Sequence, residues 1–289
     1  MHDYLNIATC YDDKVRIYAC DTTNTIKEAQ KIHNLWPTSC AALGRLLTMG
    51  LIMSSMQKAN EHLSIIVDGG GSIGRLTVEA HNNVVKGYCH NPGVYLTKND
   101  GNLAVGYGVG NEGTLTVIKD MGMRTPFTST INLVTGEITD DFNAYFLQSE
   151  QTYTAISLGV MFDKEGKATV AGGFLVQLLP DCPMETVNLL EERLKDVKGA
   201  ANLLEAGNTP LDIINYISDG KYKLLDTKEL GYHCDCSEER FKRALVSLGK
   251  DELNSMIADN KPIEINCNFC NKKYSFDVEV LKDLVKLSK

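Results

Sequence analysis

The alternation of apolar and polar residues predicts a mixture of strands and helices from the start of the chain. Residues 14–20 alternate between the two types, which suits a strand. Thr22 or Thr23 follows at the position of a helix N-cap, and we expect that helix to run to about Asn34. The chain therefore begins with the pattern of an α/β protein.

A second, longer helix is expected over residues 39–59, opened by Pro37 and Thr38. Its apolar residues recur every three or four positions, which predicts one buried face. That face consists of Leu43, Leu46, Leu47, Gly50 and Leu51.

Gly and Asn turns separate further strand-like segments. We expect strands over residues 63–67, 75–80, 84–89, 114–118 and 127–133, and a helix near residues 140–151. Residues 153–162 and 168–177 have the pattern of a hairpin around Lys164-Glu165-Gly166-Lys167. Residues 1–180 are therefore predicted to form an α/β (α+β) core domain.

Pro180 and Pro183 mark a change in the pattern. We expect one amphipathic helix over residues 184–197 and a shorter one over residues 210–217, with glycines interrupting the stretch. Their apolar faces are Val187, Leu190, Leu194 and Val197 on the first helix and Leu211, Ile214 and Ile217 on the second. We interpret residues 181–232 as a helical linker and residues 233–289 as a small separate domain.

Composition and charge exclude several classes of protein. The 289 residues are 43% hydrophobic and 23% charged, which is ordinary for a globular chain. The net charge of −8 argues against a protein whose main activity is to bind the phosphate backbone of nucleic acids. Residues 1–6 lack the basic flank of a signal peptide, and the apolar stretch 46–53 is too short to span a bilayer. We therefore expect a cytoplasmic protein with free thiols and no membrane partner.

The cysteines give the strongest chemical signal. Four of the nine form Cys234-Asp235-Cys236 and, thirty residues later, Cys267-Asn268-Phe269-Cys270. Two close pairs of thiolates suit a tetrahedral zinc ion, and four sulfurs leave no open position for zinc catalysis. His233 lies beside the cluster but is not needed as a ligand. The remaining cysteines are scattered, and we interpret them as inert core or surface thiols: Cys10, Cys20, Cys40, Cys89 and Cys182.

The zinc cluster has more than one possible role. A plain structural zinc ribbon and a disulfide pair are both simple alternatives. A 57-residue tail is too small to rely on its core alone, so a metal would contribute much of its folding free energy. Because thiolates are the form that oxidants attack, the same cluster is a potential redox switch.

Two glycine-rich segments are candidates for ligand loops. Residues 108–113 match G-x-G-x-x-G, but a strand pattern follows where a dinucleotide site needs a helix, so a turn is expected. The amides of residues 69–71 could cradle an anion or form a hairpin loop. We find no P-loop pattern and no identifiable base and nucleophile set, so we expect neither ATP-driven chemistry nor an enzyme.

Several short motifs together resemble a known family, the redox-regulated holdase chaperones called the 33 kDa chaperonin. The spacing C-x-C, about thirty residues, then C-x-x-C is typical of that family, and the resemblance covers nearly the whole chain. At the zinc end the motifs are Tyr232-His233-Cys234-Asp235-Cys236-Ser237-Glu238-Glu239-Arg240, Arg243-Ala244-Leu245, Ser247-Leu248-Gly249, Cys267-Asn268-Phe269-Cys270-Asn271 and Tyr274-Ser275-Phe276. Towards the N-terminus they are Gly69-Gly70-Gly71, Lys86-Gly87-Tyr88, Asn91-Pro92, residues 113–122, Gly136-Glu137-Ile138, Ser149-Glu150-Gln151 and Ala171-Gly172-Gly173.

The resemblance implies a heat-shock, stress-response chaperone with one Zn²⁺ held by Cys234, Cys236, Cys267 and Cys270. It implies that the reduced, zinc-bound form is inactive. Peroxide with heat, or hypochlorous acid, would release the zinc and form the disulfides Cys234–Cys236 and Cys267–Cys270. The zinc domain and linker would then unfold, and the protein would dimerise. This active homodimer would bind unfolding client proteins without ATP and later pass them to ATP-dependent chaperones.

Two other functions are open alternatives. A zinc-ribbon protein that binds nucleic acid would need a basic face, whereas residues 233–289 carry ten basic and ten acidic residues. An enzyme that uses the glycine-rich loops, with a merely structural zinc, would need a catalytic set that the sequence does not reveal.

Overall fold

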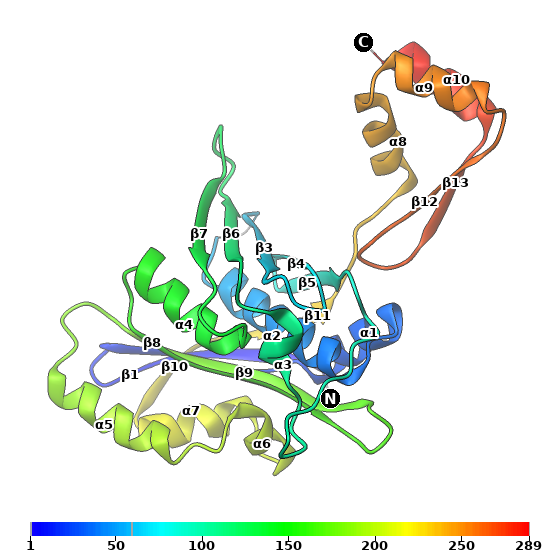
Figure 1. Cartoon of the computed structure of the whole chain (residues 1–289). Helices are drawn as coiled ribbons and strands as arrows, with labels where there is room; N and C mark the ends of the chain where they lie inside the picture. The colour runs from blue at the N-terminus through cyan, green and yellow to red at the C-terminus, as the bar shows by residue number, and fades with distance from the viewer. Residues whose placement is uncertain (1, 59, 289) are drawn as a thin grey trace. The chain divides into compact units, whose positions relative to one another are not determined.

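The structure is a computed structural model that describes residues 2–58 and 60–288. The chain divides into two compact units, Met1–His233 and Cys234–Lys289, and Figure 1 traces their elements. Each unit has its own cluster of buried apolar side chains. The chain is a mixed α/β protein, as the sequence predicts.

One sheet of the first unit has the strand order β10-β1-β2-β9-β8, with every neighbouring pair antiparallel. Its central strands are buried on both faces because helices cover both sides of the sheet. The strands are β1 (Tyr4–Cys10), β2 (Val15–Asp21), β8 (Thr154–Phe162), β9 (Ala168–Leu178) and β10 (Tyr222–Glu229).

The second sheet has the order β11-β5-β4-β3-β6-β7 and is antiparallel except for the parallel pair β11 and β5. The short strand β11 is also held by its side chain, since the Tyr232 hydroxyl lies 3.3 Å from the amide nitrogen and 3.1 Å from the carbonyl oxygen of Gly87. The strands are β3 (His62–Asp68), β4 (Leu76–His81), β5 (Val84–Cys89), β6 (Thr114–Asp120), β7 (Phe127–Asn132) and β11 (Gly231–Tyr232).

Helix α2 (Pro37–Ser55) lies between the two sheets and is buried almost all round. The prediction of a single buried face is therefore wrong. The reason lies in its hydroxyl residues: Thr48, Ser54 and Ser55 donate hydrogen bonds back to carbonyls of the same helix, so they can be buried. The helix ends at Ser55, earlier than predicted, and Ala59 lies outside the described residues. No helix in the described part of the chain has the length and apolar character to cross a membrane.

Helix α1 (Thr23–His33) begins where the sequence predicts, but Thr22 does not cap it through its side chain. The Thr22 hydroxyl instead lies 2.8 Å from that of Thr48. The carboxylate of buried Asp3 accepts from the amides of Asn24 and Thr25 at 2.9 and 2.6 Å. A residue distant in sequence therefore accepts hydrogen bonds from backbone amides in the first turn of the helix, which have no partner within the helix.

Residues 184–218 cover the outer face of the sheet that contains β1, as Figure 1 shows. Leu190, Ile213, Ile214 and Ile217 are buried there against β1, β2 and β9. The helices are α5 (Met184–Lys195), α6 (Ala200–Glu205) and α7 (Pro210–Ser218). The sequence did not predict α6, nor strand β10, which follows them and pairs with β1. The use of this stretch as a linker stays a prediction, as does the division at residues 180 and 232.

Helices α3 (Val105–Val109) and α4 (Ile138–Ser149) complete the first unit. Among the described residues of the second unit, three helices and a hairpin enclose the core: α8 (Glu238–Ser247), α9 (Lys250–Ala258), β12 (Ile263–Asn266), β13 (Lys273–Phe276) and α10 (Val278–Leu287). Ser237 caps α8 by accepting from the Arg240 amide at 3.2 Å. This cap fixes the start of α8 directly after the cysteine at position 236.

Candidate metal centre

The sulfurs of Cys234, Cys236, Cys267 and Cys270 all lie within 4.8 Å of one another. Cys234 and Cys236 come from the extended segment before α8, and Cys267 and Cys270 from the turn between β12 and β13. Among the described residues this group of ligand atoms contains no histidine, so His233 is not part of it. The structure therefore brings together the four residues that the sequence singles out.

The turn between β12 and β13 has the local geometry of a zinc knuckle. The Cys267 amide donates to the Lys272 carbonyl at 2.9 Å. The Cys267 carbonyl accepts from the amides of Cys270 and Asn271 at 3.3 and 2.8 Å. Asn271 has the left-handed φ of 57°, a conformation that Asn tolerates better than most residues. These bonds turn the chain sharply and point both sulfurs to one side.

The spacing of the sulfurs fits a tetrahedral thiolate site. Cys234 and Cys267 have their sulfurs 3.7 Å apart, and those of Cys236 and Cys270 are 3.4 Å apart. With zinc–sulfur bonds of about 2.3 Å, the edges of a sulfur tetrahedron are about 3.8 Å long. All four cysteines are free thiols. Four soft donors at this spacing could hold one zinc ion, with no place left for a substrate.

The four thiols differ in their surroundings. Cys267 is buried and the other three are half-buried. Burial raises the pKa of Cys234 and of Cys270. Burial also disfavours the Cys236 thiolate, but hydrogen bonds from Tyr274 and the other thiols outweigh it and lower the pKa of Cys236. Without metal, Cys236 is therefore the most readily ionised of these three thiols.

The sequence pattern assigns no role to the Tyr274 hydroxyl, which donates to the Cys236 sulfur at 3.1 Å and lies 3.0 Å from the Cys236 carbonyl oxygen. The signal that could have found it is the alternation in Lys273-Tyr274-Ser275-Phe276. Tyr274 and Phe276 are buried while their neighbours are exposed. A tyrosine that faces the core beside a cluster of thiols needs a partner for its hydroxyl, and Cys236 supplies it.

The scattered cysteines have a different environment. Cys10, Cys20, Cys40 and Cys89 are buried, and Cys182 is half-buried. Burial raises the pKa of Cys10, Cys40 and Cys89 to about 12. These thiols are therefore protonated near neutral pH and poorly reactive.

The two glycine-rich segments pack against each other. The Gly71 and Ile73 amides donate to the carbonyls of Val109 and Gly108, each at 2.9 Å, so neither amide is available to cradle an anion. Strand β6 begins at Thr114, directly after the G-x-G-x-x-G match, where a dinucleotide site needs a helix. A Cβ added at Gly69 or Gly110 would overlap backbone atoms of the facing segment. The glycines therefore serve close packing.

The fold and site thus define a mixed α/β protein with a four-thiol centre in a small C-terminal unit. Residues 3–277 match the family model described as Hsp33 protein. The "33 kDa chaperonin" of Bacillus cytotoxicus is 41% identical over 289 residues, covering 99% of both chains. That of Thermoanaerobacter pseudethanolicus is also 41% identical, over all of this chain and 99% of its own.

A solved structure agrees with these relatives. The crystal structure of the 33 kDa chaperonin (heat shock protein 33 homolog) from Thermotoga maritima has a TM-score of 0.91 and 33% sequence identity, and the match covers 99% of each chain. The chain belongs to the Hsp33 family of heat-shock chaperones. Chaperones generally act by binding other proteins rather than as enzymes, so the family implies unfolded clients as partners.

Proposed function

We propose that this protein is an ATP-independent holdase that oxidation switches on. The observation that carries the proposal is the gathering of four free cysteine sulfurs within 4.8 Å in a member of a chaperone family. A closed four-thiol site leaves no room for catalysis at a metal. It does offer two pairs of thiols that an oxidant can join.

In the reduced, inactive form Cys234, Cys236, Cys267 and Cys270 act as metal ligands. A bound zinc ion supplies folding free energy to the small C-terminal unit and keeps the four sulfurs deprotonated. The apolar core beside them is small, which supports a need for this extra stabilisation. Its buried residues are Leu245, Leu253, Cys267, Tyr274, Phe276, Leu281 and Leu284.

Oxidation converts the four thiolates into two disulfides. With hydrogen peroxide as the oxidant, two thiolates, two protons and one peroxide molecule give one disulfide and two water molecules, and two electrons pass from the sulfurs to the peroxide. We assign the pairs Cys234–Cys236 and Cys267–Cys270, which follow the pattern of sequence neighbours. Because disulfide sulfurs are poor ligands, the chain loses its hold on the metal and the C-terminal unit unfolds.

The client-binding surface then comes from the segment that precedes the cluster. Leu190, Ile213, Ile214 and Ile217 are buried against the first sheet in the folded protein. Release of α5–α7 exposes this apolar surface, which is the kind of surface that binds unfolding proteins. The active form is a homodimer in the cytoplasm, and it passes its clients to ATP-dependent chaperones.

Light scattering of a heat-denatured client tests the proposal. We expect the oxidised protein to suppress scattering and the reduced, zinc-loaded protein to leave it unchanged. Reduction with zinc should restore the inactive form. The Cys182→Ser variant serves as a control, because it removes a half-buried thiol that lies outside the cluster. It should behave like the unaltered protein in both redox states. An oxidised protein that fails to suppress scattering would contradict the proposal.

The nucleic-acid alternative gains no support from the family, whose members are chaperones. Salt-dependent binding of DNA or RNA by the reduced protein would be needed to revive it.

A further inference from the structure

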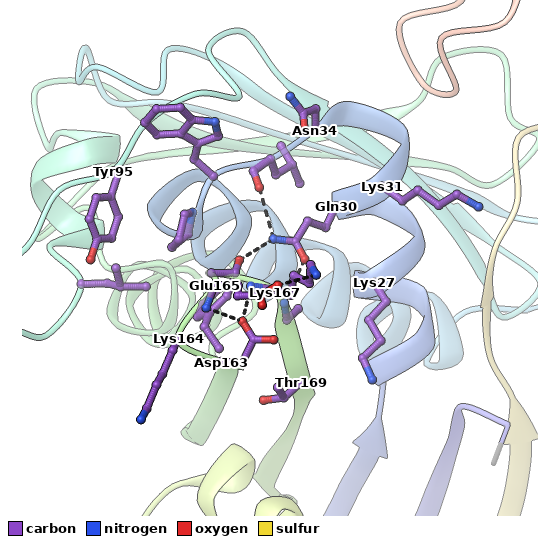
Figure 2. Close-up of a pocket in the computed structure, with 17 residues that line it drawn as sticks. Lys27, Gln30, Lys31, Asn34, Tyr95, Asp163, Lys164, Glu165, Lys167 and Thr169 are labelled. Carbon is purple, nitrogen blue, oxygen red and sulfur yellow. Dashed lines mark hydrogen bonds and ion pairs between the residues drawn. The ribbon is translucent and has the colours of Figure 1, made fainter.

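The first unit carries an open pocket of about 1060 Å³ that the proposed switch does not use. It lies between the C-terminal half of α1, the turn into α2, Tyr95, and the hairpin that joins β8 to β9, as Figure 2 shows. Its volume is at the upper end of the range of roughly 300–1,000 Å³ for small-molecule sites. Many of its lining residues are exposed, so it does not enclose a ligand.

The two sides of the pocket are fixed to each other by Gln30. Its amide nitrogen donates to the carbonyls of Leu35 and Gly166 at 3.2 and 2.8 Å. Its oxygen accepts from the Ala168 amide at 2.9 Å. These bonds, drawn in Figure 2, join the helix to the hairpin. The pocket is therefore formed before any ligand arrives.

Three lysines give the pocket an unbalanced positive charge. Lys27 and Lys31 lie one turn apart on α1, and Lys164 comes from the hairpin. All three are exposed, and no ion pair or side-chain hydrogen bond is formed by them among the described residues. This local charge stands out in a chain whose net charge is −8.

The acidic residues of the pocket are already engaged. One Asp163 oxygen accepts from the amides of Glu165 and Lys167, each at 2.9 Å. Glu165 pairs with the Lys167 ammonium at 2.6 Å. Asp163 keeps its negative charge, but the pocket lining carries four lysines against two carboxylates, so its net charge is positive and an external anion can bind there.

Aromatic side chains lie on the same pocket. Trp36 and Tyr95 are 51% and 57% exposed, although large aromatic residues are usually buried. Phe162 adds a half-buried ring at the base of the hairpin. A ligand that fits must therefore offer apolar or aromatic groups beside its negative charges.

We propose that this pocket binds an extended segment of client polypeptide in which Asp or Glu residues alternate with aromatic residues. The inference rests on the proposed holdase function and names a class of client for it. An unfolded segment suits an open, preformed site, because its side chains reach the lysines and the rings at separate points.

The net charge of the protein favours this occupant over a nucleic acid. A nucleic acid extends beyond the pocket over the surface of an acidic protein, where its phosphates are repelled. A short acidic segment places its charges only beside the lysines.

Trp36 is the only tryptophan in the chain, so its fluorescence reports on this pocket directly. The probe is a short unstructured peptide of alternating Asp and Phe residues, added to the oxidised full-length protein, which is the form proposed to bind clients. We expect a saturable change in Trp36 emission that weakens with added salt. The same peptide with Asn in place of Asp should bind at least tenfold more weakly.

Matched variants test the role of the lysines. The triple variant K27Q/K31Q/K164Q should weaken peptide binding about tenfold, since each exposed ion pair contributes little by itself. The control K198Q/K221Q/K223Q makes the same charge change at exposed lysines outside the pocket and should bind as the unaltered protein does. Circular dichroism checks that both variants are folded.

Three results would overturn the inference. They are an unchanged Trp36 emission, equal binding of the Asn peptide, and lysine-dependent binding of ATP or an oligonucleotide in place of the peptide. The experiment measures peptide binding and uses no aggregating client. Its failure therefore leaves the redox switch standing, and a failure of the switch leaves the pocket standing.

Discussion

The hydroxyl of Tyr274 donates to the sulfur of Cys236 at 3.1 Å and lies 3.0 Å from the carbonyl oxygen of the same residue. Tyr274 belongs to β13, the strand that follows the Cys267–Cys270 turn. One short hairpin thus supplies two sulfurs and also a hydrogen-bond donor to a third. Burial alone would raise the pKa of Cys236, but this bond and those from the other thiols lower it.

The Tyr274→Phe variant should make Cys236 less reactive. It keeps the ring, which packs 4.7 Å from that of Phe241, and removes only the donor. Without the donor the pKa of Cys236 rises, so we expect alkylation of Cys236 in the reduced, metal-free protein to slow about three- to tenfold near neutral pH. Site-resolved mass spectrometry measures this rate. Equal rates in the two proteins would show that Tyr274 does not activate the thiol.

Removal of metal should unfold the C-terminal unit and spare the first unit. Metal binding energies in zinc-finger peptides are on the order of 10–16 kcal/mol, more than a small core can replace. After chelation we expect amide hydrogens of α8–α10 to lose their protection from exchange, while those of α2 keep it. Protection that survives chelation in α8–α10 would mean that the apolar core suffices.

The packing of α7 should set the oxidant concentration at which the chaperone becomes active. Ile214 is fully buried against the first sheet, and its replacement by Ala is expected to cost about 2–5 kcal/mol. Because this weakens the docking of the segment that the switch releases, the Ile214→Ala variant should suppress client aggregation at severalfold lower oxidant. Leu225→Ala changes a side chain that is 45% exposed and should leave the required oxidant concentration unchanged. If the Ile214→Ala variant needs the same oxidant concentration as the unaltered protein, α7 is not part of the switch.

Alkaline pH should destabilise the first unit through its buried thiols. Burial raises the pKa of Cys40 from 9.0 to about 12. The stability that the protonated thiol contributes is therefore complete below pH 9 and is lost as the pH rises toward 12. Over this window the Cys40→Ala variant should lose stability less steeply, by about 1.4 kcal/mol per pH unit. Denaturant unfolding at several pH values checks this, and identical slopes would contradict it.

The local pattern predicted those elements whose apolar residues follow a clear period. The hairpin of β8 and β9 and the strand Val84–Cys89 appear as expected. The sequence pattern does not reveal β10, because it is an exposed edge strand whose residues show no alternation of burial. The pattern does not reveal β1 either, and the pairing of β1 with β10 joins residues more than two hundred positions apart. Such non-local pairs leave no trace in a short window of sequence.

The candidate metal centre was predicted more fully than the fold around it. Thiol ligands are few, and their spacing alone marks Cys234, Cys236, Cys267 and Cys270. What the sequence could not give is the contact of Tyr274 with Cys236, since it depends on how β13 packs beside the segment before α8. The cap that Asp3 provides for α1 is hidden for the same reason.

The sulfurs of Cys234 and Cys267 lie 3.7 Å apart and those of Cys236 and Cys270 lie 3.4 Å apart, although the proposed disulfides join sequence neighbours. In the folded cluster all four sulfurs are therefore close to one another, so the disulfide pairing has to be determined on the oxidised protein. Peptide mapping after peroxide treatment should find Cys234–Cys236 and Cys267–Cys270. Cross-pairs would mean that the C-terminal unit stays closed when it is oxidised.

Zinc release, thiol oxidation and client binding can be followed together in one experiment. Bound zinc, free thiols and client light scattering are measured in the same sample before and after peroxide at mild heat. We expect the release of one zinc ion, the loss of the four cluster thiols with Cys10, Cys20, Cys40 and Cys89 kept, and suppressed scattering that appears with that release. Zinc that stays bound with unchanged scattering would contradict the proposed switch, and the cluster would then be a structural support only.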